Sequence, residues 1–135
     1  MARSSTMQQL VFVGERRSHR AARMGVSLQD GRLAARTLHD ALRAAHVDPA
    51  AAVYFNLFHD DPADRRPCEN AVQAIRSLAA AGALIVALGR HVQAGLRAAG
   101  VPFVPLTHPA ARGAIRARSV YQQHLRDALA GALRA

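Results

Sequence analysis

The sequence predicts a single α/β domain in which a four-stranded parallel sheet is flanked by helices. Short runs of β-branched and other apolar residues alternate four times with longer segments of helical periodicity. The chain has 135 residues, which suffices for one domain with one sizeable core. Half of the residues are apolar, so we expect folding over residues 9–135, after a flexible N-terminus at residues 1–8.

Four apolar runs have the length and composition of buried strands. They are residues 10–15 (LVFVGE), 51–57 (AAVYFNL), 83–89 (ALIVALG) and 101–106 (VPFVPL). The third run is apolar throughout, as expected of a strand that is buried on both faces. Because a helical segment separates each strand from the next, we expect parallel strands with right-handed crossovers.

Four further segments carry apolar residues at the spacing of one helix face. They are residues 31–46, 67–82, 90–100 and 117–134. Leu33 is expected on the buried face of the first helix, and Val120 on the buried face of the last. Pro67 marks the start of the second helix and Gly82 its C-terminal cap.

Two long irregular segments, residues 16–30 and 58–66, each follow a predicted strand. They therefore lie at the carboxyl edge of the sheet, where ligands bind in this architecture. The strand ends at this edge contribute Gly14, Glu15, Asn56, Arg90, His91 and His108. We expect these residues to converge on one site.

Several of these residues also have a purely structural interpretation. Proline often ends strands, so His108, which precedes Pro109, would also suit a simple turn. Gly14 would suit a tight strand-to-helix turn, and Asn56 a turn cap. Both interpretations stay open at this point.

The net charge of +9 indicates a polyanionic partner, most often nucleic acid. All 18 basic residues are arginine. Because the chain has no lysine and is rich in alanine, the choice of arginine reflects base composition, and only the excess over nine acids is informative. We expect Arg112, Arg116 and Arg118, which follow the His-Pro pair, to contact phosphates.

Several classes of protein are excluded by what the sequence lacks. No apolar run is long enough to span a membrane, and the first residues lack the apolar core of a secretion signal. One cysteine, Cys68, can form neither an internal disulfide nor a cysteine metal cage. The segment after the first strand lacks the glycines of a dinucleotide fingerprint. We therefore expect a cytoplasmic protein without membrane contact and without a bound metal.

The ordered set of motifs resembles the uracil-DNA glycosylase superfamily, particularly its compact bacterial branches. FVGE at residues 12–15 is similar to the first-strand motif that continues there as Gly-Glu-Ala-Pro-Gly or Gly-Gln-Asp-Pro. VYFNL at residues 53–57 resembles the second strand with its base-reading asparagine, and VPLTHPAAR at residues 104–112 resembles the His-Pro-Ser loop. The resemblance covers residues 10 to about 133.

This resemblance implies a three-layer sandwich and a cofactor-free N-glycosylase, favoured as a monomer, that acts in base-excision repair. Its partner would be DNA, single-stranded or with a flipped base, from which it removes uracil or another deaminated base. His108 would stabilise the departing base, Glu15 would hold the attacking water, and Asn56 would read the base. The other base-binding positions would be Gly14, Leu28 and Phe55. The phosphate contacts would be Arg16, Arg17, Arg90, Arg112, Arg116 and Arg118.

The sequence departs from the superfamily pattern in the first loop, where Arg16-Arg17-Ser18 replaces a tight turn. The aromatic residue that stacks on the base is also missing. Leu28 lies near its place, so a phenylalanine would have to substitute, and the candidates are Phe12, Phe55 and Phe58. Two alternatives follow: a non-catalytic relative that binds DNA, a nucleotide or a base, and an unrelated small α/β hydrolase or nucleotide-binding enzyme.

Overall fold

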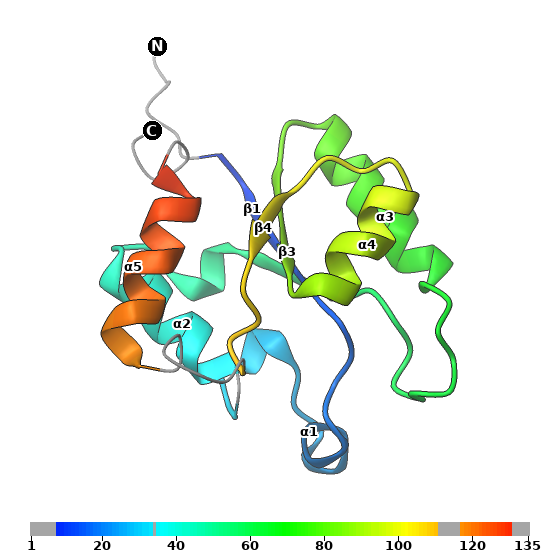
Figure 1. The fold of residues 1–135 in the computed structure, drawn as a ribbon, viewed down its shortest axis with the longest axis horizontal. Coiled ribbons are helices and arrows are strands. Elements are labelled where there is room, and N and C mark those ends of the chain that lie inside the picture. Colours follow the sequence, from blue (N-terminus) through cyan, green and yellow to red (C-terminus); the bar gives the residue numbers. More distant parts are fainter. Residues whose placement is uncertain (1–7, 34, 111–116, 131–135) are drawn as a thin grey trace.

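A four-stranded, all-parallel sheet organises the computed structural model, which describes residues 8–33, 35–110 and 117–130 (Figure 1). The strands are β1 (Leu10–Gly14), β2 (Val53–Asn56), β3 (Leu84–Leu88) and β4 (Val104–Leu106). Their order across the sheet is β2-β1-β3-β4. The predicted α/β class with four parallel strands is confirmed.

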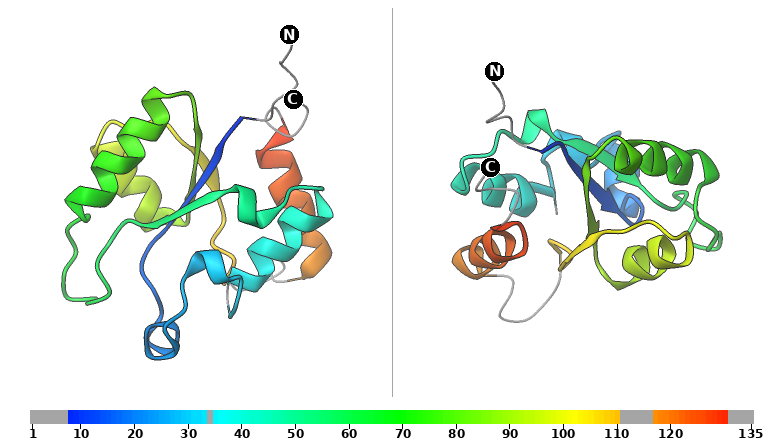
Figure 2. Two further views of the ribbon diagram at one scale, coloured as in Figure 1. Left: turned by 180° about the vertical axis from the view of Figure 1, so that it is seen from behind. Right: turned by 90° about the horizontal axis from the view of Figure 1, so that it is seen from above.

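The helices lie on both faces of the sheet and make a three-layer arrangement (Figure 2). They are α1 (His19–Met24), α2 (Ala35–Ala44), α3 (Glu69–Ala80), α4 (Arg90–Ala98) and α5 (Arg118–Ala128), with 3₁₀ turns η1 (Leu28–Asp30) and η2 (Pro49–Ala51). On one face α2 and α5 pack on Phe12 and Val86, and on the other α3 and α4 pack on Val11 and Ile85. Because side chains alternate along a strand, neighbouring residues belong to different cores.

The short helix α1 was not predicted, because residues 16–30 have no apolar periodicity. Local capping defines it instead: the Ser18 side chain accepts from the Ala21 N–H at 3.0 Å. Gly25 ends the helix in the left-handed conformation, with φ 70°. None of its residues is buried, so α1 is a surface element beside the end of β1.

Two details of the helix predictions are wrong. The helix predicted from residue 31 begins at Ala35, because Leu33 has a left-handed φ of 58° that no α-helix contains. On α5 the predicted inward residue Val120 is 43% exposed, whereas Tyr121 and Leu125 are buried. The tyrosine ring covers more apolar surface than the valine, and its hydroxyl donates to the carbonyl of Thr107 at 2.8 Å.

Among the helices of the described residues, none is both long and apolar enough to cross a bilayer.

Candidate functional site

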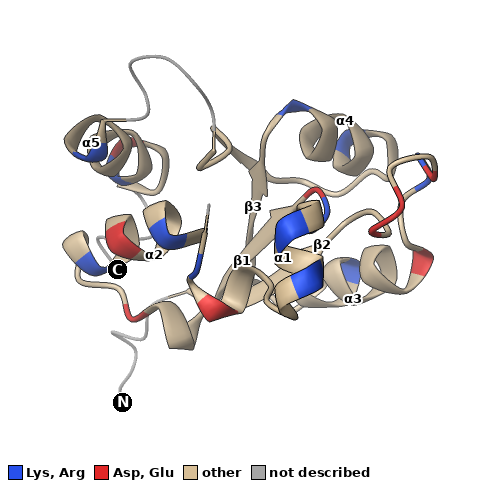
Figure 3. Cartoon of the chain, turned by 90° about the horizontal axis from the view of Figure 1, so that it is seen from below, with Lys and Arg blue, Asp and Glu red and all other residues tan. Residues whose placement is uncertain are grey.

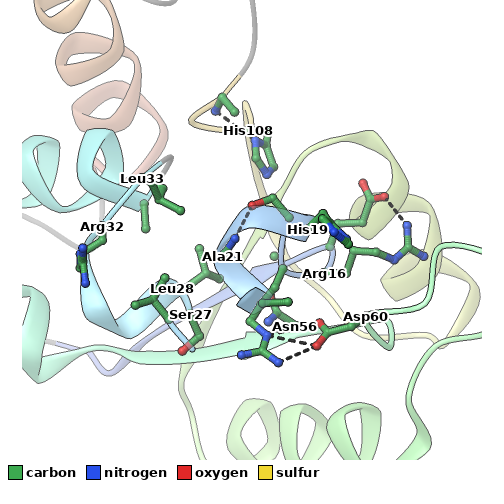
Figure 4. Close-up of a pocket in the computed structure, with 18 of the residues that line it drawn as sticks. Arg16, His19, Ala21, Ser27, Leu28, Arg32, Leu33, Asn56, Asp60 and His108 are labelled. Atoms are coloured by element: carbon green, nitrogen blue, oxygen red, sulfur yellow. Dashed lines mark hydrogen bonds and ion pairs between the residues drawn. The ribbon is translucent and has the colours of Figure 1, made fainter. Parts of the chain in front are cut away.

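A cleft of about 640 Å³ opens at the carboxyl ends of β1, β2 and β4 (Figure 4). Its walls come from the segment after β1, including α1 and η1, and from the loops after β2 and β4. Of the residues predicted for the site, the cleft is lined by Gly14, Glu15, Arg16, Arg17, Leu28, Asn56 and His108. The expected edge of the sheet therefore carries a cleft that brings these predicted residues together.

Gly14 and Asn56 are partners in the parallel register of β1 and β2, so both lie at the floor of the cleft. A Cβ on Gly14 would stand 3.3 Å from Asn56 Oδ1 and 2.8 Å from Leu28 Cδ1. The missing side chain thus lets the amide and the leucine approach the strand end closely. Within the described part of the chain the Asn56 amide forms no side-chain hydrogen bond, so it is available to a ligand.

Phe55, predicted to bind the base, does not line the cleft. It packs in the core beneath α3 and α4 with Val13, on the opposite sheet face from Asn56. Adjacent residues of a strand point to opposite faces of the sheet, so the sequence already indicated that Phe55 and Asn56 cannot both face one site. The other candidate phenylalanines are also occupied: Phe12 is fully buried, and Phe58 lies under the Arg16 guanidinium at 5.4 Å.

Leu28 forms an apolar wall of the cleft and is held there from α2. The side chain of His39 contacts the Leu28 carbonyl oxygen through Nε2 at 2.7 Å. A carbonyl only accepts, so Nε2 of His39 carries a proton. Burial lowers the pKa of His39, which keeps the ring neutral. His39 also stacks on Tyr54, with ring centroids 5.3 Å apart.

His108 reaches the cleft from the end of β4 and points into it (Figure 4). The backbone N–H of Ala110 donates to its Nδ1 at 3.0 Å. Nδ1 is therefore unprotonated, and the neutral ring carries its proton on Nε2. Burial lowers the pKa of His108, and the charge of Glu15 only partly offsets this. At neutral pH the cleft thus contains an uncharged imidazole with one N–H to donate.

Gly89 supports His108 from the turn between β3 and α4. Its N–H donates to the Leu106 carbonyl at 2.9 Å, and its φ of 90° favours glycine. A Cβ there would lie 3.4 Å from Cβ of His108. Gly89 therefore allows the His108 loop to pack directly against the turn.

The Glu15 carboxylate is held by two groups at the rim of the cleft. Arg16 Nη1 donates to Oε2 at 3.0 Å, and His91 Nδ1 lies 3.1 Å from Oε1. Arg16 also donates to the carbonyls of His59 and Asp64. Arg16 is thereby tied to Glu15 and to the loop after β2 through three of its five N–H donors.

Arg17 is likewise engaged, by Asp60 in the loop after β2. Its Nε and Nη2 donate to Asp60 Oδ2 at 3.1 and 2.7 Å. This pair lowers the pKa of Asp60 and raises that of Arg17. Both side chains are partly exposed, so the pair is accessible to competing ions.

The remaining predicted phosphate contacts are not brought to the cleft. Arg90 is exposed at the start of α4 and does not line the cleft. Arg118, the first residue of α5, lies 3.7 Å from Asp40 of α2. Arg112 and Arg116 fall outside the described residues. Exposed arginines that the sequence reasoning did not single out are Arg20 and Arg23 on α1 and Arg32 beside the cleft. Figure 3 shows basic residues on α1 at this end of the molecule.

Within the ranges that the structure describes, no three His, Cys, Asp or Glu side chains are grouped so as to hold a metal ion. A scan against protein-family models and a search of curated proteins both find no match to this chain. Membership of the uracil-DNA glycosylase superfamily therefore stays a prediction from the residues.

Proposed function

We propose that the protein hydrolyses the N-glycosidic bond of uracil, or of another deaminated base, in DNA. The observation that carries this proposal is the hydrogen bond from the Ala110 N–H to Nδ1 of His108, which leaves the ring proton on Nε2. Its neutral ring offers an Nε2–H to the same cleft that the Asn56 amide and the Glu15 carboxylate line. These three groups match the three tasks of the reaction: stabilising a leaving group, reading a base and holding water.

In this reaction the C–N bond breaks with its electron pair moving to the base, which departs as an anion. A hydrogen bond from His108 Nε2 to a base carbonyl oxygen strengthens as this charge develops, so it stabilises the transition state more than the substrate. Burial favours this role, because it keeps the ring uncharged before the bond breaks. The proximity of Glu15 stabilises any positive charge that the ring acquires.

Water must add to the sugar carbon as the base leaves. The Glu15 carboxylate has unused lone pairs besides those facing Arg16 and His91, and they can accept a hydrogen bond from that water. The water oxygen bonds to the sugar carbon, and its proton passes to the carboxylate and then to solvent. The contacts with Arg16 and His91 keep Glu15 oriented for this step.

The negative DNA backbone would be bound by exposed arginines of α1 and of the segment that follows it. Arg20 and Arg23 are exposed on α1 and Arg32 is an exposed residue of the cleft lining, whereas Arg16 and Arg17 are bound to acidic and carbonyl groups. The volume of about 640 Å³ exceeds that of one base and lies within the range of ligand pockets in proteins. The cleft is therefore large enough for a base with its sugar attached.

A second candidate is base binding without excision, and one observation favours it. No described residue that lines the cleft is Phe, Tyr or Trp, so a flipped base would rest on Leu28 instead of an aromatic ring. Weaker stacking would leave a site that recognises a base and positions it less firmly.

Excision is tested with a single-stranded oligonucleotide that contains one uracil, by measuring alkali-sensitive abasic product. We expect activity from the wild-type protein, and His108→Ala should lower kcat about 100-fold or more with little change in KM. The matched control is His46→Asn, at an exposed histidine on the opposite edge of the sheet whose φ of 62° asparagine tolerates. If the wild-type protein binds the oligonucleotide without forming product, the second candidate replaces the first.

A further inference from the structure

The residue that precedes His108 is held by two side chains of α5. Tyr121 Oη donates to the Thr107 carbonyl oxygen at 2.8 Å, and the Thr107 N–H donates to Nε2 of His124 at 3.0 Å. Both backbone polar groups of Thr107 are thus bound from an element that lies 14 and 17 residues further along the chain. Neither Tyr121 nor His124 was among the residues predicted for the site.

These bonds replace the support that the sheet no longer provides. β4 is the last strand of the sheet order and ends at Leu106, so residue 107 has no further strand pairing. On its other side the His108 loop lies against the turn between β3 and α4, where a Cβ on Gly89 would stand 3.4 Å from Cβ of His108. Without α5, the backbone that carries the His108 ring would lose the bonds on its N-terminal side.

Tyr121 and His124 form a rigid pair suited to this task. Tyr121 is 1% exposed, and its ring meets that of His124 edge-on, with centroids 5.9 Å apart and planes at 65°. Leu125, fully buried on the same helix, joins α5 to the core beneath β4. Two bonds from a packed helix restrict the backbone of Thr107 more than one bond from a surface side chain would.

We propose that Tyr121 and His124 are positioning residues that aim the Nε2–H of His108 into the cleft. This inference rests on the proposed excision of a base, in which that N–H must meet a carbonyl oxygen with hydrogen-bond geometry. Displacing a catalytic group by about 1 Å costs about 100-fold in rate. The two side chains touch no substrate and act through the loop.

The test compares kcat and KM for Tyr121→Phe, His124→Leu and His124→Gln with the wild-type values. Tyr121→Phe and His124→Leu should each lower kcat 10- to 100-fold and leave KM within about twofold. His124→Gln should recover most of the rate, because its Oε1 can accept from the Thr107 N–H. The matched control is Tyr54→Phe, which also removes a half-buried hydroxyl bonded to a backbone carbonyl, that of Pro49 at 2.7 Å, away from the His108 loop. It should lose stability and keep its kcat.

A second readout is independent of activity. Nitrogen-15 spectra of the histidine rings, with the His108 signal identified by its loss in His108→Gln, report which ring nitrogen is protonated. The wild-type spectrum should show Nε2–H only, and His124→Leu should show a mixture of the two tautomers. If the spectra change as expected while the wild-type protein excises no base, the positioning holds and the proposed function fails. Unchanged spectra and unchanged kcat in both Tyr121→Phe and His124→Leu would overturn the positioning role.

Discussion

Asn56 and His108 present complementary hydrogen-bonding groups to the cleft. The amide offers one acceptor and two donors, and the imidazole offers one donor, since Nδ1 is occupied by the Ala110 N–H. Uracil presents a ring N–H beside a carbonyl on its pairing edge, which a fixed amide satisfies. Cytosine presents an acceptor nitrogen beside an amino donor, so the same amide would be mispaired. Each unpaired group in a desolvated pocket costs about 1–3 kcal/mol, which is enough to reject cytosine.

Asn56→Ala should therefore abolish uracil excision and leave the thermal midpoint within about 2 °C of the wild-type value, because the side chain forms no hydrogen bond within the described residues. Activity on the uracil oligonucleotide and a thermal melt measure the two effects. Asn70→Ala, at an exposed position on α3, is the control that should change neither. A variant that melts several degrees earlier, or that keeps full activity, would return Asn56 to a structural role.

At the scale of elements, the turn η1 owes its position to α2. Its carbonyl at Leu28 is bound by His39, and Asp30 Oδ2 accepts from the Ser27 N–H at 2.7 Å. Gly31 follows with φ 66°, and a Cβ there would lie 2.5 Å from Nδ1 of His39. The apolar wall of the cleft at Leu28 is thus held in place by α2, a helix that begins only after the left-handed backbone at Leu33.

Leu28→Ala should raise KM for the uracil oligonucleotide roughly tenfold, because removing the apolar side chain loses about 1–2 kcal/mol of contact with the base. Phe55→Leu is the contrasting variant, since Phe55 packs beneath α3 and α4. It should lower the thermal midpoint and leave KM unchanged. Steady-state kinetics and melting curves on both variants make the comparison, and the reverse pattern would place the base on the other face of the sheet.

For the whole molecule, two histidines couple the fold to pH. Burial is the main reason that the pKa values of His39 and His108 lie below the ordinary imidazole value. In the unfolded chain both rings take up protons below about pH 6.5, whereas in the folded protein they resist protonation. The unfolded state therefore binds more protons in this window, so the free energy of unfolding decreases as the pH falls. The carboxyl of Asp60, whose pKa is lowered by Arg17, acts in the same direction only below about pH 4.

We accordingly expect urea-unfolding free energies to fall between pH 7 and pH 5. The double variant His39→Gln with His108→Gln should show a flatter dependence in that range, because neither glutamine titrates. Each single variant should lie between the double variant and the wild type. Equal slopes for all four proteins would show that other groups govern the acid sensitivity.

The order of elements, the parallel sheet and the edge that carries the site follow from local patterns. Apolar periodicity and strand-to-helix alternation depend on near neighbours in the sequence, so they can be predicted without knowledge of the tertiary contacts. The same alternation placed Gly14, Asn56 and His108 at strand ends, where register and topology bring them together. Helix α1 escaped prediction because six surface residues carry no such pattern.

The state of each site residue was decided only by the tertiary structure. Arg16 and Arg17 were expected to bind phosphates, yet residues 59–64 engage both, more than 40 positions away. The tautomer of His108 and the support of its loop depend on Ala110 and on α5. Hydrogen bonds and ion pairs need atoms about 3 Å apart, and periodicity does not encode which distant side chains meet at that distance.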